Sequence, residues 1–179
     1  MSGYRIETPR LKLRRMVDDD LDNMAALLGD PAVMCHYPAP KTREEAKAWI
    51  DWNKRNYAEH DFGLWIMESR SGDFLGDCGL TLQEVDGVPE VEVGYHVLAE
   101  HQGRGYASEA AAVCLEFAAR SGVERVIAII NPANIPSQRV AVKCGLQLEK
   151  YSNMGGLEQL IFATNKDFTS TWSGPAAGN

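Results

Sequence analysis

The sequence has little of what marks membrane, metal-binding or redox proteins. No apolar run among its 179 residues is long enough to span a bilayer. It holds four cysteines, Cys35, Cys78, Cys114 and Cys144, which are widely spaced and form no CxxC pair. That spacing argues against zinc binding and thioredoxin-like chemistry. We therefore expect no metal site and four reduced, buried thiols.

An excess of positive charge is also missing. The chain carries 18 Lys and Arg residues against 25 Asp and Glu, a net charge of -7, which disfavours non-specific binding to nucleic acid. An anionic ligand would therefore need local cations, for which Arg104, Arg139 and Lys143 are candidates. The first fifteen residues are rich in charge and contain no signal-peptide core. We expect a cytoplasmic protein that binds neither nucleic acid nor membrane.

What is present indicates one globular domain. Apolar residues make up 45% of the chain and charged residues 24%, which are ordinary values for a folded protein. The length suits a single domain with a substantial core. We assign residues 1–168 to this domain. Residues 169–179 are small and polar apart from Trp172, and we expect them to form a flexible tail.

The most informative stretch changes its hydrophobic period from that of a strand to that of a helix. Residues 91–98 alternate between two faces, with the valines and Tyr95 on one face and Glu92 and His96 on the other. From Ala107 onward, small apolar residues recur at helical spacing. The pattern predicts a strand, a short loop and a helix.

The loop between them, residues 102–107, carries Gly103 and Gly105. Glycine lets the backbone turn tightly and brings N–H groups close to a ligand. The helix that follows begins with unpaired N–H donors and the positive end of its dipole. This loop therefore predicts a site for phosphate groups.

Alternation and turn residues place the other elements. Helices are expected after Asp18, after the capping box of Thr42 and Glu45, and between Asn134 and Gly145. Strands joined by short turns run antiparallel, whereas the strand after the central helical crossover should run parallel to the strand before it. The fold class is α/β (α+β), with a mixed, mostly antiparallel sheet and flanking helices. About seven strands are expected, at residues 4–16, 62–68, 74–83, 91–98, 123–130, 146–153 and 157–165.

Two motifs resemble those of a known family. Gln102-x-x-Gly105-x-Ala107 resembles the acyl-CoA pyrophosphate loop of the GNAT N-acetyltransferase superfamily. Asn134-x-x-Ser137, followed by Lys143-Cys144-Gly145-Leu146, is similar to a second block of that superfamily, with Leu146 where Phe is usual. This block and the Thr8-Pro9-Arg10-Leu11-x-Leu13-Arg14 opening are most similar to the Rim-like (RimJ/RimL) branch. The resemblance covers roughly residues 4–168.

The resemblance implies an acyl-CoA N-acyltransferase fold whose sheet splays between the fourth strand, at 91–98, and the fifth, at 124–130. It implies acetyl-CoA as co-substrate, with its pantetheine arm in that gap. The residues that it places at the cofactor are Tyr95, Val97, Leu98, Gln102, Gly103, Arg104, Gly105, Tyr106, Ala107, Ser108, Asn134 and Ser137.

The implied reaction is direct transfer of acetyl to an amine. A base must deprotonate the amine, and Glu92 is our choice, with His96 or a water chain as alternatives. The superfamily's tyrosine acid corresponds here to Ala141, so Ser137 would instead protonate the sulfur, with Tyr151 a weaker candidate. A backbone N–H near Val97 or Leu98 would stabilise the oxyanion. By the same resemblance, His36 and Tyr37 are expected to contact the substrate.

Other functions stay open. The absent tyrosine is compatible with a non-catalytic acyl-CoA sensor. Gly103-x-Gly105-x-x-Ser108 loosely imitates a dinucleotide-binding fingerprint, but an antiparallel hairpin precedes it. The acceptor, a protein N-terminus or a small amine, is not encoded in any recognisable motif. A homodimer is conceivable through an exposed sheet edge.

Overall fold

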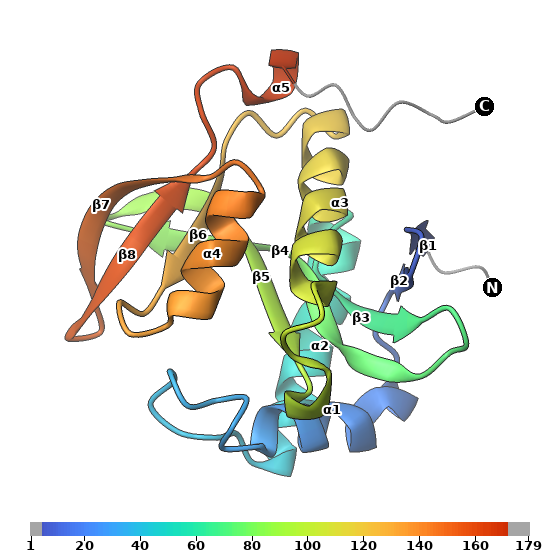
Figure 1. Ribbon diagram of the computed structural model, residues 1–179. Helices are drawn as coiled ribbons and strands as arrows, with labels where there is room; N and C mark the ends of the chain where they lie inside the picture. The colour runs from blue at the N-terminus through green and yellow to red at the C-terminus, as the bar shows by residue number, and fades with distance from the viewer. Residues whose placement is uncertain (1–4, 172–179) are drawn as a thin grey trace, which may run out of the picture.

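The computed structural model describes residues 5–171 and contains one mixed sheet with helices on both faces (Figure 1). The sheet has eight strands in the order β1-β2-β3-β4-β5-β6-β8-β7. Neighbouring strands are antiparallel except for β5 and β6, which are parallel. The strands are β1 (Arg5–Glu7), β2 (Leu11–Arg14), β3 (Leu64–Ser69), β4 (Phe74–Val85), β5 (Val88–Val97), β6 (Val126–Ile130), β7 (Gln147–Met154) and β8 (Leu157–Ala163).

The eighth strand arises because the first expected strand is a hairpin. Its turn is closed by two hydrogen bonds: the Thr8 N–H donates to the Leu11 carbonyl, and the Leu11 N–H donates to the Thr8 hydroxyl, both at 2.9 Å. Pro9 between them lacks an N–H and cannot continue a ladder. Residues 4–16 therefore give β1 and β2 rather than one strand.

The helices follow the sequence signals closely. Thr42 and Glu45 form the expected capping box of α2, and the Asn134 side chain caps α4 by accepting from the Ser137 N–H at 3.2 Å. The acidic run at 18–20 is a 3-10 turn that leads into α1. The helices are η1 (Asp18–Asp20), α1 (Leu21–Gly29), α2 (Arg43–His60), η2 (Ala99–His101), α3 (Tyr106–Arg120), α4 (Ile135–Lys143) and α5 (Phe168–Thr171).

Short helix α5 takes up residues 169–171 of the expected tail. The rest of that tail, with Trp172, lies outside the described residues. Among the described residues, no helix is long and apolar enough to cross a membrane. Within the same part of the chain, no group of three or more His, Cys, Asp or Glu side chains is arranged to hold a metal ion.

The sheet splays where expected, between β5 and β6. These strands share only two register pairs, Val91 with Val126 and Glu92 with Ile127. In contrast, β5 is paired with β4 along its full length, from Val97 opposite Gly76 to Val88 opposite Val85. The carboxyl-terminal half of β5 therefore has a strand neighbour on one side only.

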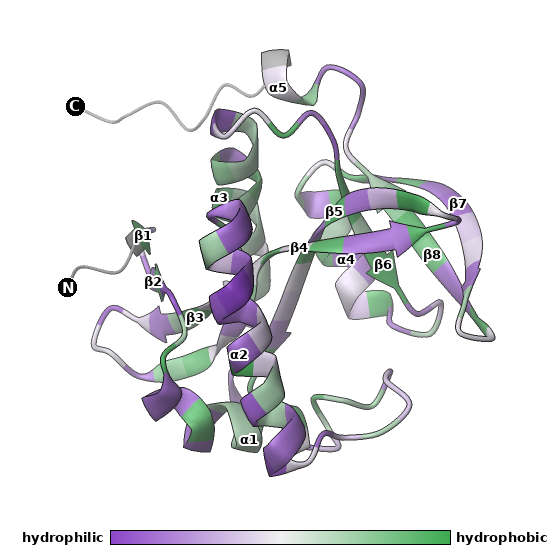
Figure 2. Cartoon of the chain, turned by 180° about the vertical axis from the view of Figure 1, so that it is seen from behind, coloured by the Kyte–Doolittle hydropathy of each residue, from purple (hydrophilic) through white to green (hydrophobic). Residues whose placement is uncertain are grey.

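The two faces of β4 and β5 are covered by different helices. On one face the Cys78 thiol lies 3.7 Å from the Cys114 thiol of α3, and on the other the Trp49 ring of α2 packs edge-on against His96. Figure 1 shows α3 and α4 in front of the sheet and α2 behind it. From behind, β6 is hydrophobic and α2 carries a hydrophilic outer surface, as burial requires (Figure 2).

The expectation of four buried thiols is wrong for Cys35. All four cysteines are free: Cys78 and Cys114 are buried, Cys144 is partly exposed and Cys35 is exposed. The apolar neighbours of Cys35 in the sequence belong to the irregular segment 30–42 that joins α1 to α2. An apolar context along the chain does not bury a residue in such a loop.

We predict that Gly79→Ala is strongly destabilising. A Cβ at Gly79 would lie 2.0 Å from the Gly63 carbonyl oxygen, so β3 and β4 would have to separate. We expect a loss of about 3 kcal/mol in the free energy of unfolding, measured in urea. The control is Gly94→Ala on the paired position of β5, where the added methyl would meet its nearest neighbour, a Leu64 methyl, at 3.6 Å. Equal losses for the two variants would contradict the close-approach argument.

Candidate active site

The carboxyl-terminal half of β5 presents polar side chains on both faces, next to the splay. Tyr95 points toward α4 and His96 toward α2. The Leu98 N–H donates to the Leu75 carbonyl at 2.9 Å. Because donors alternate along an antiparallel ladder, the N–H of Val97 points to the opposite side, where β6 has already diverged. Val97, and not Leu98, therefore offers a backbone donor to the gap.

On the α2 face, His96 bridges Asp77 and Tyr37. Its Nδ1 lies 2.7 Å from Asp77 Oδ1, and its Nε2 lies 2.8 Å from the Tyr37 hydroxyl. The Trp49 indole donates to the other Asp77 oxygen at 3.2 Å. Asp77 is 0% exposed and His96 7%. An ionised carboxylate only accepts hydrogen bonds, so the Nδ1–H tautomer of His96 faces Asp77 and leaves Nε2 for Tyr37.

The electrostatics of this cluster follow from burial and from two carboxylates. Burial lowers the pKa of His96, but the charge and hydrogen bond of Asp77, together with the charge of Glu92, outweigh it and raise the pKa above its usual value. Tyr37 as a residue is 45% exposed, yet its hydroxyl faces inward. Burial, followed by the charges of Glu92 and Asp77, raises the pKa of that phenol.

Glu92 lies on the same face of β5 as His96, and it is partly buried. Burial raises the pKa of its carboxyl to about 8, and the charge of His96 acts in the opposite direction. Among residues 5–171 its carboxylate has no hydrogen-bond or ion-pair partner. An unpaired carboxyl that titrates near neutral pH is suited to accept a proton.

The segment between α1 and α2, residues 30–42, closes this face at the splay. Tyr37 ties it to β5 through His96, and the His36 carbonyl accepts from the Asn131 side chain, just after β6, at 3.4 Å. The segment thus spans the carboxyl ends of both parting strands. It is the backbone of His36, not its imidazole, that makes the contact to β6.

On the opposite face, Tyr95 is joined to the start of α4. Its hydroxyl lies 2.9 Å from both the carbonyl oxygen and the hydroxyl of Ser137. The Ser137 N–H is held in turn by Asn134. Burial raises the pKa of the Tyr95 phenol although the Ser137 bond lowers it, so Tyr95 stays neutral and positions the Ser137 hydroxyl.

The glycine-bearing loop lies at the end of β5 and leads into α3. Gly103 and Gly105 have φ values of 74° and 82°, the left-handed conformation that glycine adopts without strain. Gly105 is the N-cap of α3 and has no side chain to cap it. Within the described chain, the N–H groups of residues 106–108 have no acceptor, so this loop fits phosphate oxygens. Gln102 folds back and donates to the Val97 carbonyl at 3.0 Å.

Arg10 clamps this loop to the amino-terminal hairpin. Its guanidinium donates to the Arg104 carbonyl at 2.9 Å and pairs with Glu109 at 2.7 Å. It also lies over the Tyr106 ring, 4.7 Å from the centroid. The Arg10 backbone N–H and the Thr8 hydroxyl also donate to Glu109, at 3.0 and 2.6 Å. The hairpin turn therefore holds the loop and the first turn of α3 together.

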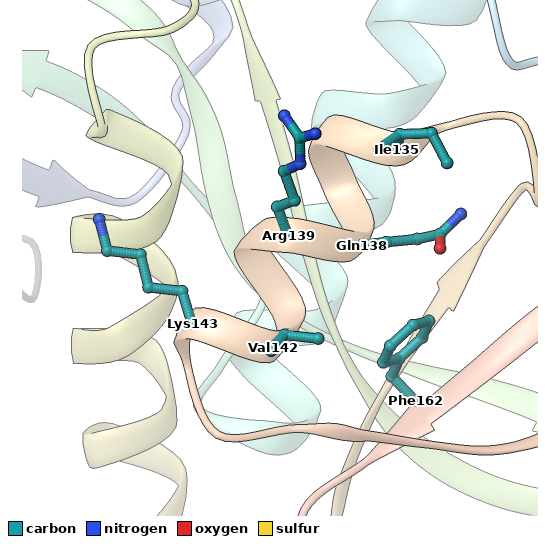
Figure 3. Close-up of a pocket in the computed structure, with 6 residues that line it drawn as sticks. All are labelled: Ile135, Gln138, Arg139, Val142, Lys143 and Phe162. Atoms are coloured by element: carbon teal, nitrogen blue, oxygen red, sulfur yellow. The ribbon is translucent and has the colours of Figure 1, made fainter.

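A shallow pocket of about 400 Å³ lies beside α4 (Figure 3). Ile135, Val142 and Phe162 supply apolar surface, and Arg139 and Lys143 supply cations. Figure 3 shows the Lys143 side chain extending toward α3. Neither Glu92 nor His96 lines this pocket, so it is separate from the polar side chains of β5.

The structure brings most of the sequence-predicted residues to the two sides of one splay. Glu92, His96 and Tyr37 lie on the α2 face, and Tyr95, Ser137 and Asn134 lie on the α4 face. Tyr151 does not join them, because it lies on β7 and is 61% exposed.

Three contributors were not predicted: Asp77, Trp49 and Arg10. The only signal for Asp77 was an acid flanked by Gly76 and Cys78 within an apolar strand. Trp49 had no signal beyond its place in the helix expected after Thr42 and Glu45. Arg10 was noted only as part of an opening similar to one branch, without a role.

Comparison with known proteins agrees with this architecture. Residues 10–147 match the acetyltransferase (GNAT) domain family. Two relatives come from Bacillus subtilis strain 168: the uncharacterized protein YkkB is 38% identical over 149 residues, covering 82% of this chain and 87% of YkkB. The uncharacterized N-acetyltransferase YnaD is 32% identical over 151 residues, covering 82% and 84%.

A solved structure shows the same fold at lower identity. RimL, named as the ribosomal L7/L12 alpha-N-protein acetyltransferase and solved in complex with coenzyme A, superimposes with a TM-score of 0.76 at 17% identity, covering 92% of this chain and 99% of RimL. The matched family spans most of the described fold, including the splay, the glycine loop and the start of α4. The chain belongs to the GNAT family of acetyltransferases.

Proposed function

We propose that this enzyme transfers acetyl from acetyl-CoA directly to a primary amine, either a protein N-terminus or the amine of a small molecule. GNAT acetyltransferases use acetyl-CoA. The observation that carries the proposal is the unpaired Glu92 carboxylate, with a pKa of about 8, on the strand that borders the splay. It supplies a base where an amine would meet the thioester.

The residues that would hold acetyl-CoA lie along β5, the loop and α4. The N–H groups of residues 103–108 would receive the pyrophosphate, with Arg104 beside them. Arg139 and Lys143 are exposed and have no ion-pair partner among residues 5–171, so they are available for a further phosphate. The free edge of β5 at Tyr95 and Val97 would pair with the amides of the pantetheine arm.

The reacting carbonyl would then lie near the Val97 N–H. A backbone donor there would stabilise the negative charge that develops on the carbonyl oxygen. Ser137, fixed by Tyr95 and Asn134, would donate a hydrogen bond to the departing sulfur. Glu92, on the other face, would take a proton from the incoming ammonium.

The function is tested by measuring acceptor-dependent release of the CoA thiol from acetyl-CoA. The panel contains short peptides with N-terminal Ser, Ala or Met, spermidine, free amino acids and aminoglycosides, with a no-acceptor blank for the protein's own four cysteines. Release with peptides alone supports an N-terminal acetyltransferase, and release with one small amine supports a small-molecule enzyme. Acetyl-CoA binding without release would favour the sensor alternative, and no binding would contradict the proposal.

We predict that Glu92→Gln removes the rise of activity with pH. The carboxyl must be ionised to act as a base, so wild-type kcat/KM should rise with pH and level off above about 8. In the variant, kcat/KM should fall about a hundredfold and should no longer rise with pH. An unchanged pH profile in the variant would contradict the assignment.

The same substitution has a stability signature that needs no activity. Burial raises the Glu92 pKa from 4.5 to about 8, so the folded state favours the protonated carboxyl. The stability tied to that proton is present at low pH and is lost as the pH rises through 8. The Tm of Glu92→Gln relative to wild type should therefore increase between pH 5 and pH 9.

We predict that Arg10→Ala weakens acetyl-CoA binding by about tenfold, because it removes a charge-assisted hydrogen bond and an ion pair that order the loop. Calorimetric titration measures the change in Kd. The control is Arg70→Ala, which removes an exposed ion pair with Glu7, on the same hairpin, at 2.9 Å. An unchanged Kd in Arg10→Ala would show that the clamp does not shape the binding site.

A further inference from the structure

We propose that Tyr37, His96 and Asp77 form a proton relay on the acceptor side of the site, in which the Tyr37 hydroxyl is a catalytic group that takes a proton from the amine nitrogen while passing its own to His96. This proposal rests on the proposed function and assigns a second proton acceptor beside Glu92.

The geometry of the relay is continuous from the surface to the core. The Tyr37 oxygen lies 2.8 Å from His96 Nε2, and His96 Nδ1 lies 2.7 Å from Asp77 Oδ1. Asp77 is fully buried and its second oxygen accepts from Trp49. Tyr37 is the outermost member of the chain: the residue is 45% exposed, and its hydroxyl points inward, toward the face of β5 that carries His96 and Glu92. Its ring also packs on the His96 ring, with centroids 5.4 Å apart.

The number of protons that the amine must lose shows why a second proton acceptor is needed. A primary ammonium must lose one proton before its nitrogen can attack, and the nitrogen must lose a second proton as the amide forms. Glu92 has no hydrogen-bond partner in the described structure and has room for one proton only. The second needs another acceptor, and the Tyr37 hydroxyl borders the same face, close enough for the charge of Glu92 to act on it.

The proposed step balances as follows. The nitrogen bonds to the acetyl carbon, and its proton moves to the Tyr37 oxygen while the Tyr37 proton moves to His96 Nε2. The C–S bond breaks and the sulfur keeps the electron pair. His96 becomes a cation that faces ionised Asp77, and Tyr37 ends the step neutral. A phenolate never forms, as expected for a hydroxyl whose pKa burial raises.

The charges around His96 favour this cation. Asp77 on β4 and Glu92 on β5 stabilise it, and Lys41, on the same segment as Tyr37, opposes it. The Lys41 ammonium lies over the Trp49 ring, 5.3 Å from the centroid. A neutral His96 is needed at the start of the step, because its Nε2 must accept the Tyr37 proton.

The competing explanation is that the Tyr37 bond only anchors the segment 30–42. An anchor and a relay predict different kinetics. Loss of an anchor disturbs acceptor binding whatever the basicity of the acceptor, whereas loss of a relay slows the proton transfer alone. A weakly basic amine releases its proton to water readily once it is bonded to carbon, so it needs the relay least.

The test compares Tyr37→Phe with wild type, using every acceptor of the panel above and hydrazine as the weakly basic probe. The variant keeps the ring and removes only the hydroxyl. We expect kcat with the best panel acceptor to fall about a hundredfold, a much smaller loss with hydrazine, and an acetyl-CoA Kd within about twofold of wild type. Tyr151→Phe, which removes an exposed hydroxyl on β7, should match wild type.

A second comparison uses His96→Gln and the double variant that combines Tyr37→Phe with His96→Gln. Residues that act as one unit give non-additive losses, so the double variant should be no slower than the slower single variant. Three results would each overturn the relay and leave the acetyltransferase proposal standing. They are a wild-type kcat in Tyr37→Phe, a double variant whose loss equals the product of the two single losses, and a loss with hydrazine as large as that with the best panel acceptor. Acetyl-CoA binding by wild type without turnover of any acceptor would overturn both.

Discussion

The parting of β5 from β6 after two register pairs is the constraint on which the site depends. A fully paired β5 would have no free N–H at Val97 and no gap between the two halves of the sheet. The parting leaves backbone groups that must find partners elsewhere. Everything described at the site, including the glycine loop, the cap of α4 and the segment 30–42, lies around this opening.

The two sides of the opening differ chemically. Toward α4, Tyr95, Ser137 and Asn134 are neutral hydrogen-bonding groups, suited to orienting a thioester and its sulfur. Toward α2, Asp77, His96 and Glu92 form a titratable cluster shielded by Trp49 and Tyr37. Under the proposed function, the thioester and the titratable groups would lie on opposite faces of this one strand.

The parts that the sequence predicted are those set by local interactions. The change of period at 91–118, the capping box of α2, the cap of α4 and the glycine loop each depend on neighbouring residues, and the structure contains them. Even the hairpin at 5–14 has a local signal in Pro9, which lacks an N–H and cannot continue a ladder.

The parts that the sequence did not predict are set by contacts between distant segments. His96 meets Asp77 across 19 residues and Tyr37 across 59. Arg10 meets Glu109 across 99. The hydrophobic periodicity of a sequence does not reveal which distant residues are in contact, and a lone histidine on a strand is most often a polar group with its hydrogen bonds satisfied. The exposure of Cys35 was missed for the same reason, since the path of segment 30–42 is fixed by its contacts with His96 and Asn131.

The most direct test of the central claim is where acetyl-CoA binds. Hydrogen–deuterium exchange with and without saturating acetyl-CoA would locate it on the backbone. The account predicts slower exchange at residues 95–108 and 134–138, which border the splay, and unchanged exchange in the β7–β8 hairpin. Protection confined to other segments, or no protection despite binding, would contradict the assignment of the splay between β5 and β6 as the acetyl-CoA site.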